Sequence, residues 1–144
     1  MILHKTILIL EDHLPTLSKI LEKLAVLEED QPYDFSLIIL TTHTQVEKYI
    51  NSTKDVEFDI ILLDRDCKLG GSFHVLELER LGSEKVISIS SVPDYNQQAK
   101  KRGVTRVVPK DYKKLDLFAD AVVKEIAGMM NSLSPTEKNI HHIK

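Results

Sequence analysis

The chain has 144 residues, of which 42% are hydrophobic and 28% are charged, and its formal net charge is −3. These values are typical of one globular domain, and they exclude a collagen, a disordered tail and a nucleic-acid binder that relies on a strong basic field. A single cysteine, Cys67, excludes an internal disulfide, and no apolar run reaches the ~20 residues of a membrane span. We therefore expect a cytoplasmic protein that contacts neither membranes nor nucleic acid directly.

Five short apolar runs alternate with helical patterns along the chain. The first three runs are almost continuously apolar, which indicates strands buried on both faces of a parallel sheet. The predicted strands are 6–10, 35–40, 58–63, 86–89 and 104–108. Apolar residues at helical spacing predict helices over 14–29, 45–50, 72–81, 94–102 and 115–130. Pro15 suits the first turn of its helix, Thr42 or Thr44 would cap the second, and Gly82 would end the third.

This alternation predicts an α/β fold with one sheet and helices on both faces. The common doubly wound, flavodoxin-like (βα)5 arrangement places five parallel strands in the order 2-1-3-4-5. One domain accounts for residues 1–130. Residues 131–136 are rich in helix breakers, so we expect 131–144 to be a flexible C-terminal tail with no room for a second domain.

Ionisable and hydroxyl side chains follow four of the predicted strands. Glu11 and Asp12 end the first strand, Asp64 the third, Ser90 the fourth and Lys110 the fifth. Ligands of open parallel sheets bind beyond the carboxyl ends of the strands, so these side chains should meet at one edge. Crowded carboxylates repel one another unless a cation joins them, and Mg²⁺ suits carboxylates combined with phosphate oxygens. A carboxylate can also act as the nucleophile that takes up a phosphoryl group.

Four segments together resemble the receiver domain of two-component response regulators. They are 7–12, 60–64, 87–91 and 103–110, and the resemblance covers roughly residues 5 to 130. It implies that Asp64 accepts a phosphoryl group from a histidine kinase or phosphotransfer protein. It also implies that Glu11, Asp12, Asp64 and the backbone carbonyl of Asp66 hold Mg²⁺, and that Ser90 and Lys110 contact the phosphoryl group. Ser88 and Ser91 are alternative hydroxyls.

The sequence departs from the receiver pattern at three positions. Val107 stands where the family often has an aromatic switch residue, which puts output through a moving ring in doubt. Lys68 replaces the usual proline of the phosphoacceptor loop. Asp66 adds a carboxylate that could bind metal or repel the phosphoryl group.

The resemblance implies a stand-alone receiver that is a monomer or a weak homodimer and signals to an unknown downstream protein. Such a domain phosphorylates and slowly dephosphorylates itself, and it is not a turnover enzyme. A degenerate receiver that binds partners without phosphate is one alternative. Another is a haloacid-dehalogenase-like phosphatase, because Asp64-Arg65-Asp66 resembles the nucleophile motif of that family.

Overall fold

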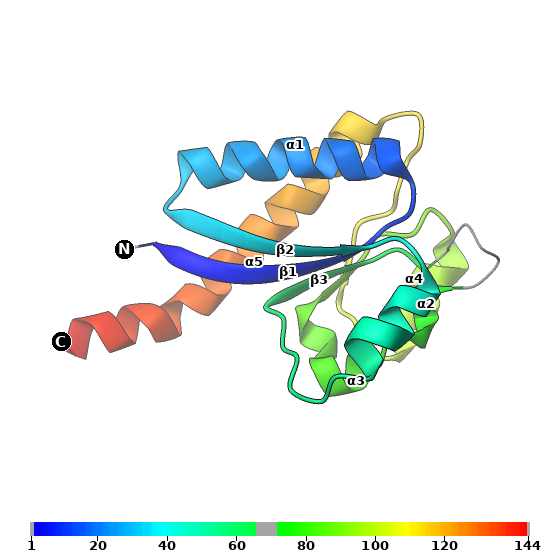
Figure 1. The fold of residues 1–144 in the computed structure, drawn as a ribbon. Helices are drawn as coiled ribbons and strands as arrows, with labels where there is room; N and C mark the ends of the chain where they lie inside the picture. Colours follow the sequence, from blue (N-terminus) through cyan, green and yellow to red (C-terminus); the bar gives the residue numbers. More distant parts are fainter. Residues whose placement is uncertain (1, 66–71, 144) are drawn as a thin grey trace.

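The computed structural model describes residues 2–65 and 72–143, with side chains as far as residue 131. Its five strands are β1 (Leu3–Leu10), β2 (Tyr33–Leu40), β3 (Ile60–Leu63), β4 (Val86–Ser88) and β5 (Arg106–Val107). They form one parallel sheet in the order β2-β1-β3-β4-β5 (Figure 1). The predicted fold class and strand order are confirmed, although β5 is shorter than the predicted 104–108.

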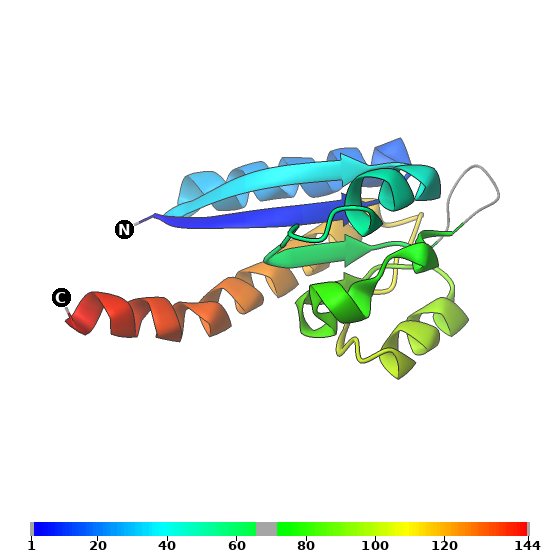
Figure 2. The same ribbon diagram turned by 60° about the horizontal axis from the view of Figure 1, so that its bottom comes forward.

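Helices cover both faces of the sheet (Figures 1 and 2). One face carries α1 (Leu14–Asp30) and α5 (Leu115–Ile143). The other face carries α2 (His43–Val46), which a π-helical turn η1 (Glu47–Asn51) continues, together with α3 (Leu78–Leu81) and α4 (Pro93–Lys101). Among the described residues, no helix is long and apolar enough to cross a membrane.

Alternation along the strands divides the core into two layers. Ile7, Ile9 and Leu62 point toward α1 and α5, whereas Leu8 and Leu63 point toward α2, α3 and α4. All five side chains are at most 5% exposed. Because successive side chains of a strand point to opposite faces, a continuous apolar run is what a strand covered on both sides requires.

The start of α2 follows the sequence prediction at its cap. Thr42 accepts a hydrogen bond from the Gln45 backbone, and the Gln45 side chain accepts one from the Thr42 backbone. This reciprocal capping box satisfies two of the donors that a helix N-terminus leaves free. The helix therefore begins at His43, two residues before the predicted 45–50.

The single helix predicted over 72–81 is wrong. The structure has a 3₁₀ turn, η2 (Phe73–Val75), then an extended Leu76, and only afterwards the short α3. Tertiary partners replace the helical hydrogen bonds of this segment. Asn51 binds the Val75 carbonyl at 2.8 Å and the Glu77 amide at 3.2 Å, and Arg102 donates to the carbonyls of His74 and Leu76.

Helix α5 continues to Ile143, beyond the predicted 115–130, and its last turns project past the sheet (Figure 2). The prediction that residues 131–144 form a flexible tail concerns motion, and it stays a prediction.

Candidate functional site

Five of the six predicted site residues lie at the carboxyl edge of the sheet, and the sixth, Asp66, is outside the described residues. Their backbones extend the ladder just past the strands: the Asp64 amide donates to Leu10 O at 3.0 Å, and the Lys110 amide donates to Ser90 O at 3.2 Å. Each of the five is at most 9% exposed; they are Glu11, Asp12, Asp64, Ser90 and Lys110. The ends of four strands thus deliver four charged side chains and a hydroxyl into a buried position.

Lys110 joins two of the carboxylates. Its Nζ lies 2.6 Å from Oδ2 of Asp64 and 2.5 Å from Oε1 of Glu11. The Nζ contact with Asp64 is also a hydrogen bond, whereas Oε1 of Glu11 has no hydrogen bond of acceptable geometry. Burial favours the neutral amine, but the charges of Glu11 and Asp64 outweigh it and raise the pKa of Lys110. Lys110 is therefore a fixed positive charge at this edge.

Among the described residues, Asp64 is the carboxylate whose pKa is most perturbed. Burial and the nearby charge of Glu11 raise the pKa of Asp64 from 3.8 to about 7, although Lys110 opposes the change. A buried carboxyl group resists ionisation because water no longer solvates its charge. In the absence of a further cation, this site holds more negative charge than Lys110 alone offsets.

The carboxylates fit a hard divalent cation. Oxygen atoms of Glu11, Asp12 and Asp64 lie within 4.8 Å of one another, and all three residues are buried. An all-oxygen ligand set with several carboxylates suits Mg²⁺ or Mn²⁺. Lys110 contacts one oxygen of Glu11 and one of Asp64, so among the described residues it is a single cation shared by two of the three carboxylates. The predicted fourth ligand, the Asp66 carbonyl, lies outside the described residues, as does Lys68.

The three serines around the end of β4 have different surroundings. Ser88 donates to Oδ1 of Asn96 in α4 at 2.6 Å, so its hydroxyl is engaged with the helix. Oγ of Ser90 accepts a hydrogen bond from the Val92 amide at 3.1 Å, which leaves its proton for another acceptor. Nδ2 of Asn96 donates to the Ser90 carbonyl at 3.0 Å, and Ser91 is only partly buried.

Two aromatic neighbours of the site were not among the predicted site residues. The rings of His13 and Tyr112 meet edge to face at 5.1 Å, and the Tyr112 ring centroid lies 5.3 Å from Nζ of Lys110. The His13 amide donates to Oε2 of Glu11 at 3.0 Å, which helps to orient that carboxylate. His13 directly follows Asp12 and Tyr112 lies two residues after Lys110, and this proximity in the sequence was the signal that could have found them.

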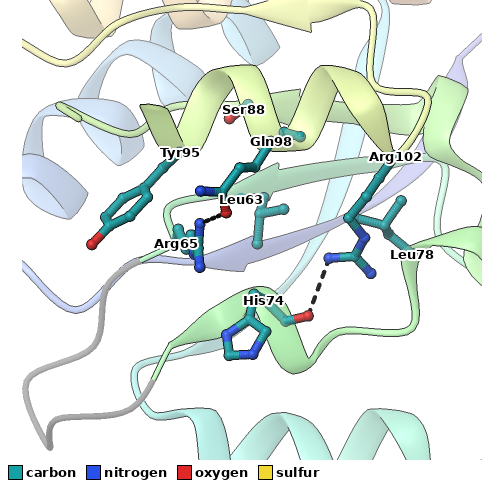
Figure 3. Close-up of a pocket in the computed structure, with 9 residues that line it drawn as sticks. Leu63, Arg65, His74, Leu78, Ser88, Tyr95, Gln98 and Arg102 are labelled. Carbon is teal, nitrogen blue, oxygen red and sulfur yellow. Dashed lines mark hydrogen bonds between the residues drawn. The ribbon is translucent and has the colours of Figure 1, made fainter. Parts of the chain in front are cut away.

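A cavity of about 220 Å³ lies between α3 and α4 and is lined in part by Leu63 and Arg65, which flank Asp64 in the sequence (Figure 3). None of the five predicted site residues lines it, so it is not where the carboxylates act. At its rim, the Arg65 guanidinium lies 4.3 Å from the Tyr95 ring centroid and donates to Gln98. Arg65 directly follows Asp64, and it therefore links the end of β3 to α4.

Neither the protein-family models nor the curated proteins contain a match to this chain. Solved structures do match it. The Mn²⁺-bound form of the response regulator Rcp1 is 19% identical with a TM-score of 0.65, and the match covers 82% of this chain and 91% of that one. The phosphorylated cyanobacterial phytochrome response regulator RcpA is 19% identical with a TM-score of 0.65, covering 85% and 91%.

A response regulator receiver domain from Rhodospirillum rubrum is also similar, at 19% identity and a TM-score of 0.61, with 89% of this chain and 94% of that chain covered. Because each match covers at least 91% of the solved chain, the similarity extends over the whole fold and is not limited to a fragment. The chain therefore has the five-stranded, doubly wound fold of response regulator receiver domains.

Proposed function

We propose that this protein is a receiver that takes up a phosphoryl group on Asp64 in a Mg²⁺-dependent reaction and signals by changing a protein-binding surface. The donor would be a histidine kinase or a phosphotransfer protein. The observation that carries the proposal is the buried contact of Lys110 Nζ with Asp64 at 2.6 Å, beside the carboxylates of Glu11 and Asp12. Neighbours that include a phosphorylated and a metal-bound response regulator support it.

The geometry supports a nucleophilic role for one oxygen of Asp64. Lys110 holds Oδ2, which leaves Oδ1 to attack the phosphorus of the donor. The new bond joins Oδ1 to phosphorus, the bond from phosphorus to the donor's imidazole nitrogen breaks, and that nitrogen keeps the electron pair. Bound Mg²⁺, held by Glu11, Asp12 and Asp64, would supply neutralisation of the phosphoryl charge. The ammonium of Lys110 adds a positive charge for a phosphoryl oxygen.

Asn96 offers a route from the phosphoryl group to α4. The uncommitted proton of Ser90 is available to a phosphoryl oxygen, and the Ser90 carbonyl is held by Asn96. A shift of Ser90 toward the phosphoryl group would therefore pull on Asn96, which also contacts Ser88. This route needs no aromatic ring at the position of Val107. The output would be contact with a downstream protein, as expected of a signalling domain that is not a turnover enzyme.

The direct test is intact-mass spectrometry after incubation with Mg²⁺ and acetyl phosphate. We expect one phosphoryl adduct in the wild type, none without Mg²⁺ and none in Asp64→Asn. Asp55→Asn is the matched control, because it makes the same change at an exposed carboxylate between η1 and β3. An adduct that persists in Asp64→Asn would contradict the assignment. A beryllofluoride titration distinguishes a short-lived phosphate from a site that takes none.

The position of Val107 favours one second candidate, a degenerate receiver that binds its partner without phosphate. Val107 lies half-buried in β5 and carries no ring that could move between two positions. If neither acetyl phosphate nor beryllofluoride modifies the wild type while a partner still binds Asp64→Asn with unchanged affinity, this second function is the correct one.

A further inference from the structure

The outer edge of β2 presents hydrogen-bonding groups that the described part of the chain does not use. β2 forms one of the two edges of the sheet, and β5 forms the other (Figure 2). The Leu3 amide donates to Pro32 O, and the Glu11 amide donates to Leu40 O. In this parallel register, the even-numbered residues of β2 bond to β1, and the odd-numbered residues turn their amides and carbonyls outward.

Side chains close this edge at both ends and leave its centre open. The outward amide of Phe35 donates to Oε2 of Glu28 at 2.9 Å, and that of Thr41 donates to Oε1 of Gln45 at 2.8 Å. Between them, no acceptor for the amides of Leu37 and Ile39 is found among the described residues. The open window therefore consists of two outward residues, with one inward-bonded residue between them.

The window also lacks the usual protection of an exposed edge. Natural edge strands carry charged side chains, proline or bulges that prevent pairing with another chain. Residues 35–42 contain no charged residue and no proline. Instead, the window carries the partly exposed aliphatic side chains of Leu37 and Ile38, which are 37% and 38% exposed.

We infer that this window binds a second copy of the chain, in a weak homodimer built by antiparallel pairing of two β2 strands. A two-fold axis at Ile38 places Leu37 opposite the partner's Ile39 and Ile39 opposite the partner's Leu37. Each of these two pairs exchanges an amide and a carbonyl in both directions, which uses all the outward groups of the window. The two sheets then become one continuous sheet.

Self-complementarity is the reason for choosing a second copy as the occupant. Only the two-fold register centred on Ile38 places Leu37 of one copy opposite Ile39 of the other. In this register the amides of Phe35 and Thr41 keep their hydrogen bonds to their own side-chain acceptors. No charge in the window opposes itself across the axis, whereas like charges placed directly opposite destabilise strand pairs. A contact this short is below the size of a stable interface, so the dimer is weak and depends on concentration. This inference does not depend on phosphorylation of Asp64.

Sedimentation equilibrium of the full chain over a range of concentrations tests the inference. We expect wild type to pass from monomer to dimer, and Ile38→Lys to dissociate at least about tenfold more readily, because two ammonium groups then face each other across the axis. Leu117→Lys is the matched control, since it makes the same change at an aliphatic side chain that is 64% exposed on α5. A wild type that stays monomeric, or a dimer that Leu117→Lys weakens and Ile38→Lys does not, would overturn the inference.

A cross-linking experiment tests the register without adding charge. In an antiparallel pair, residues opposite each other without mutual hydrogen bonds have Cα atoms about 4.5 Å apart, within the range that a disulfide spans. In a Cys67→Ser background, Ile38→Cys should form a disulfide dimer under mild oxidation at least about tenfold faster than Leu117→Cys. Equal rates for the two variants would refute pairing at Ile38, even if the protein dimerises elsewhere.

Discussion

The raised pKa of Asp64 predicts that the metal-free protein loses stability as pH increases. Burial and the charge of Glu11 raise this pKa from 3.8 to about 7 in the folded protein. The folded state then binds the Asp64 proton more tightly than the unfolded chain does. The contribution to the free energy of unfolding is fully present below the unfolded pKa of 3.8, and it is lost as pH rises through about 7.

The size of the loss follows from the two pKa values. At about 1.4 kcal/mol per pKa unit, the separation between them corresponds to a total of about 4 kcal/mol. For a single group titrating between these values, about 2 kcal/mol of that total is lost between about pH 5.5 and about pH 7.5. Asp64→Asn removes the titrating group, so the pH-dependent difference between wild type and variant isolates this contribution.

Urea unfolding followed by circular dichroism, in the presence of a chelator, measures the effect in a chain that has no tryptophan. Relative to Asp64→Asn, the free energy of unfolding of the wild type should fall by about 2 kcal/mol between about pH 5.5 and about pH 7.5. Added Mg²⁺ should recover stability at the higher pH in the wild type and much less in the variant. The reasoning would be refuted if the difference in unfolding free energy between wild type and Asp64→Asn stayed constant with pH. It would also be refuted if the wild type gained stability relative to the variant as pH rises.

Three further variants test contacts in and around α4. Arg102→Ala should lower the free energy of unfolding by about 1–3 kcal/mol in urea titrations, because its guanidinium binds two carbonyls and the Glu79 carboxylate. Gly103→Ala should cost about 1–3 kcal/mol in the same assay, since Gly103 has φ +98° and a Cβ there would lie 3.0 Å from Ser83 Oγ. Asn96→Ala should leave the phosphoryl adduct intact while abolishing any beryllofluoride-dependent change in hydrogen exchange of α4. Unchanged unfolding in either of the first two, or an unchanged α4 response in the third, would contradict these assignments.

The sheet and its acidic edge were predictable because local signals and topology agree there. Apolar runs such as 60–63 identify strands covered on both faces, and parallel topology then gathers Asp64 and Lys110 at one edge. The helix predicted over 72–81 was wrong because its spacing cannot show that Asn51 and Arg102 take up the segment's backbone groups. The role of Asn96 was hidden because no sequence pattern shows that its side chain turns back to the Ser88 hydroxyl and the Ser90 carbonyl. The contact between His13 and Tyr112 was hidden because it joins residues far apart in the sequence.

The broken helix before α3 has a consequence for cooperativity. The segment 73–77 has few hydrogen bonds of its own, and Arg102 at the end of α4 supplies those of His74 and Leu76. Opening of the C-terminal end of α4 removes both of these donors at once, which couples the segment to the helix in native-state hydrogen exchange, while Asn51 still binds Val75 and Glu77. A signal that loosens α4 would therefore also loosen the chain on the far side of the cavity, and the responding surface would extend beyond α4 itself.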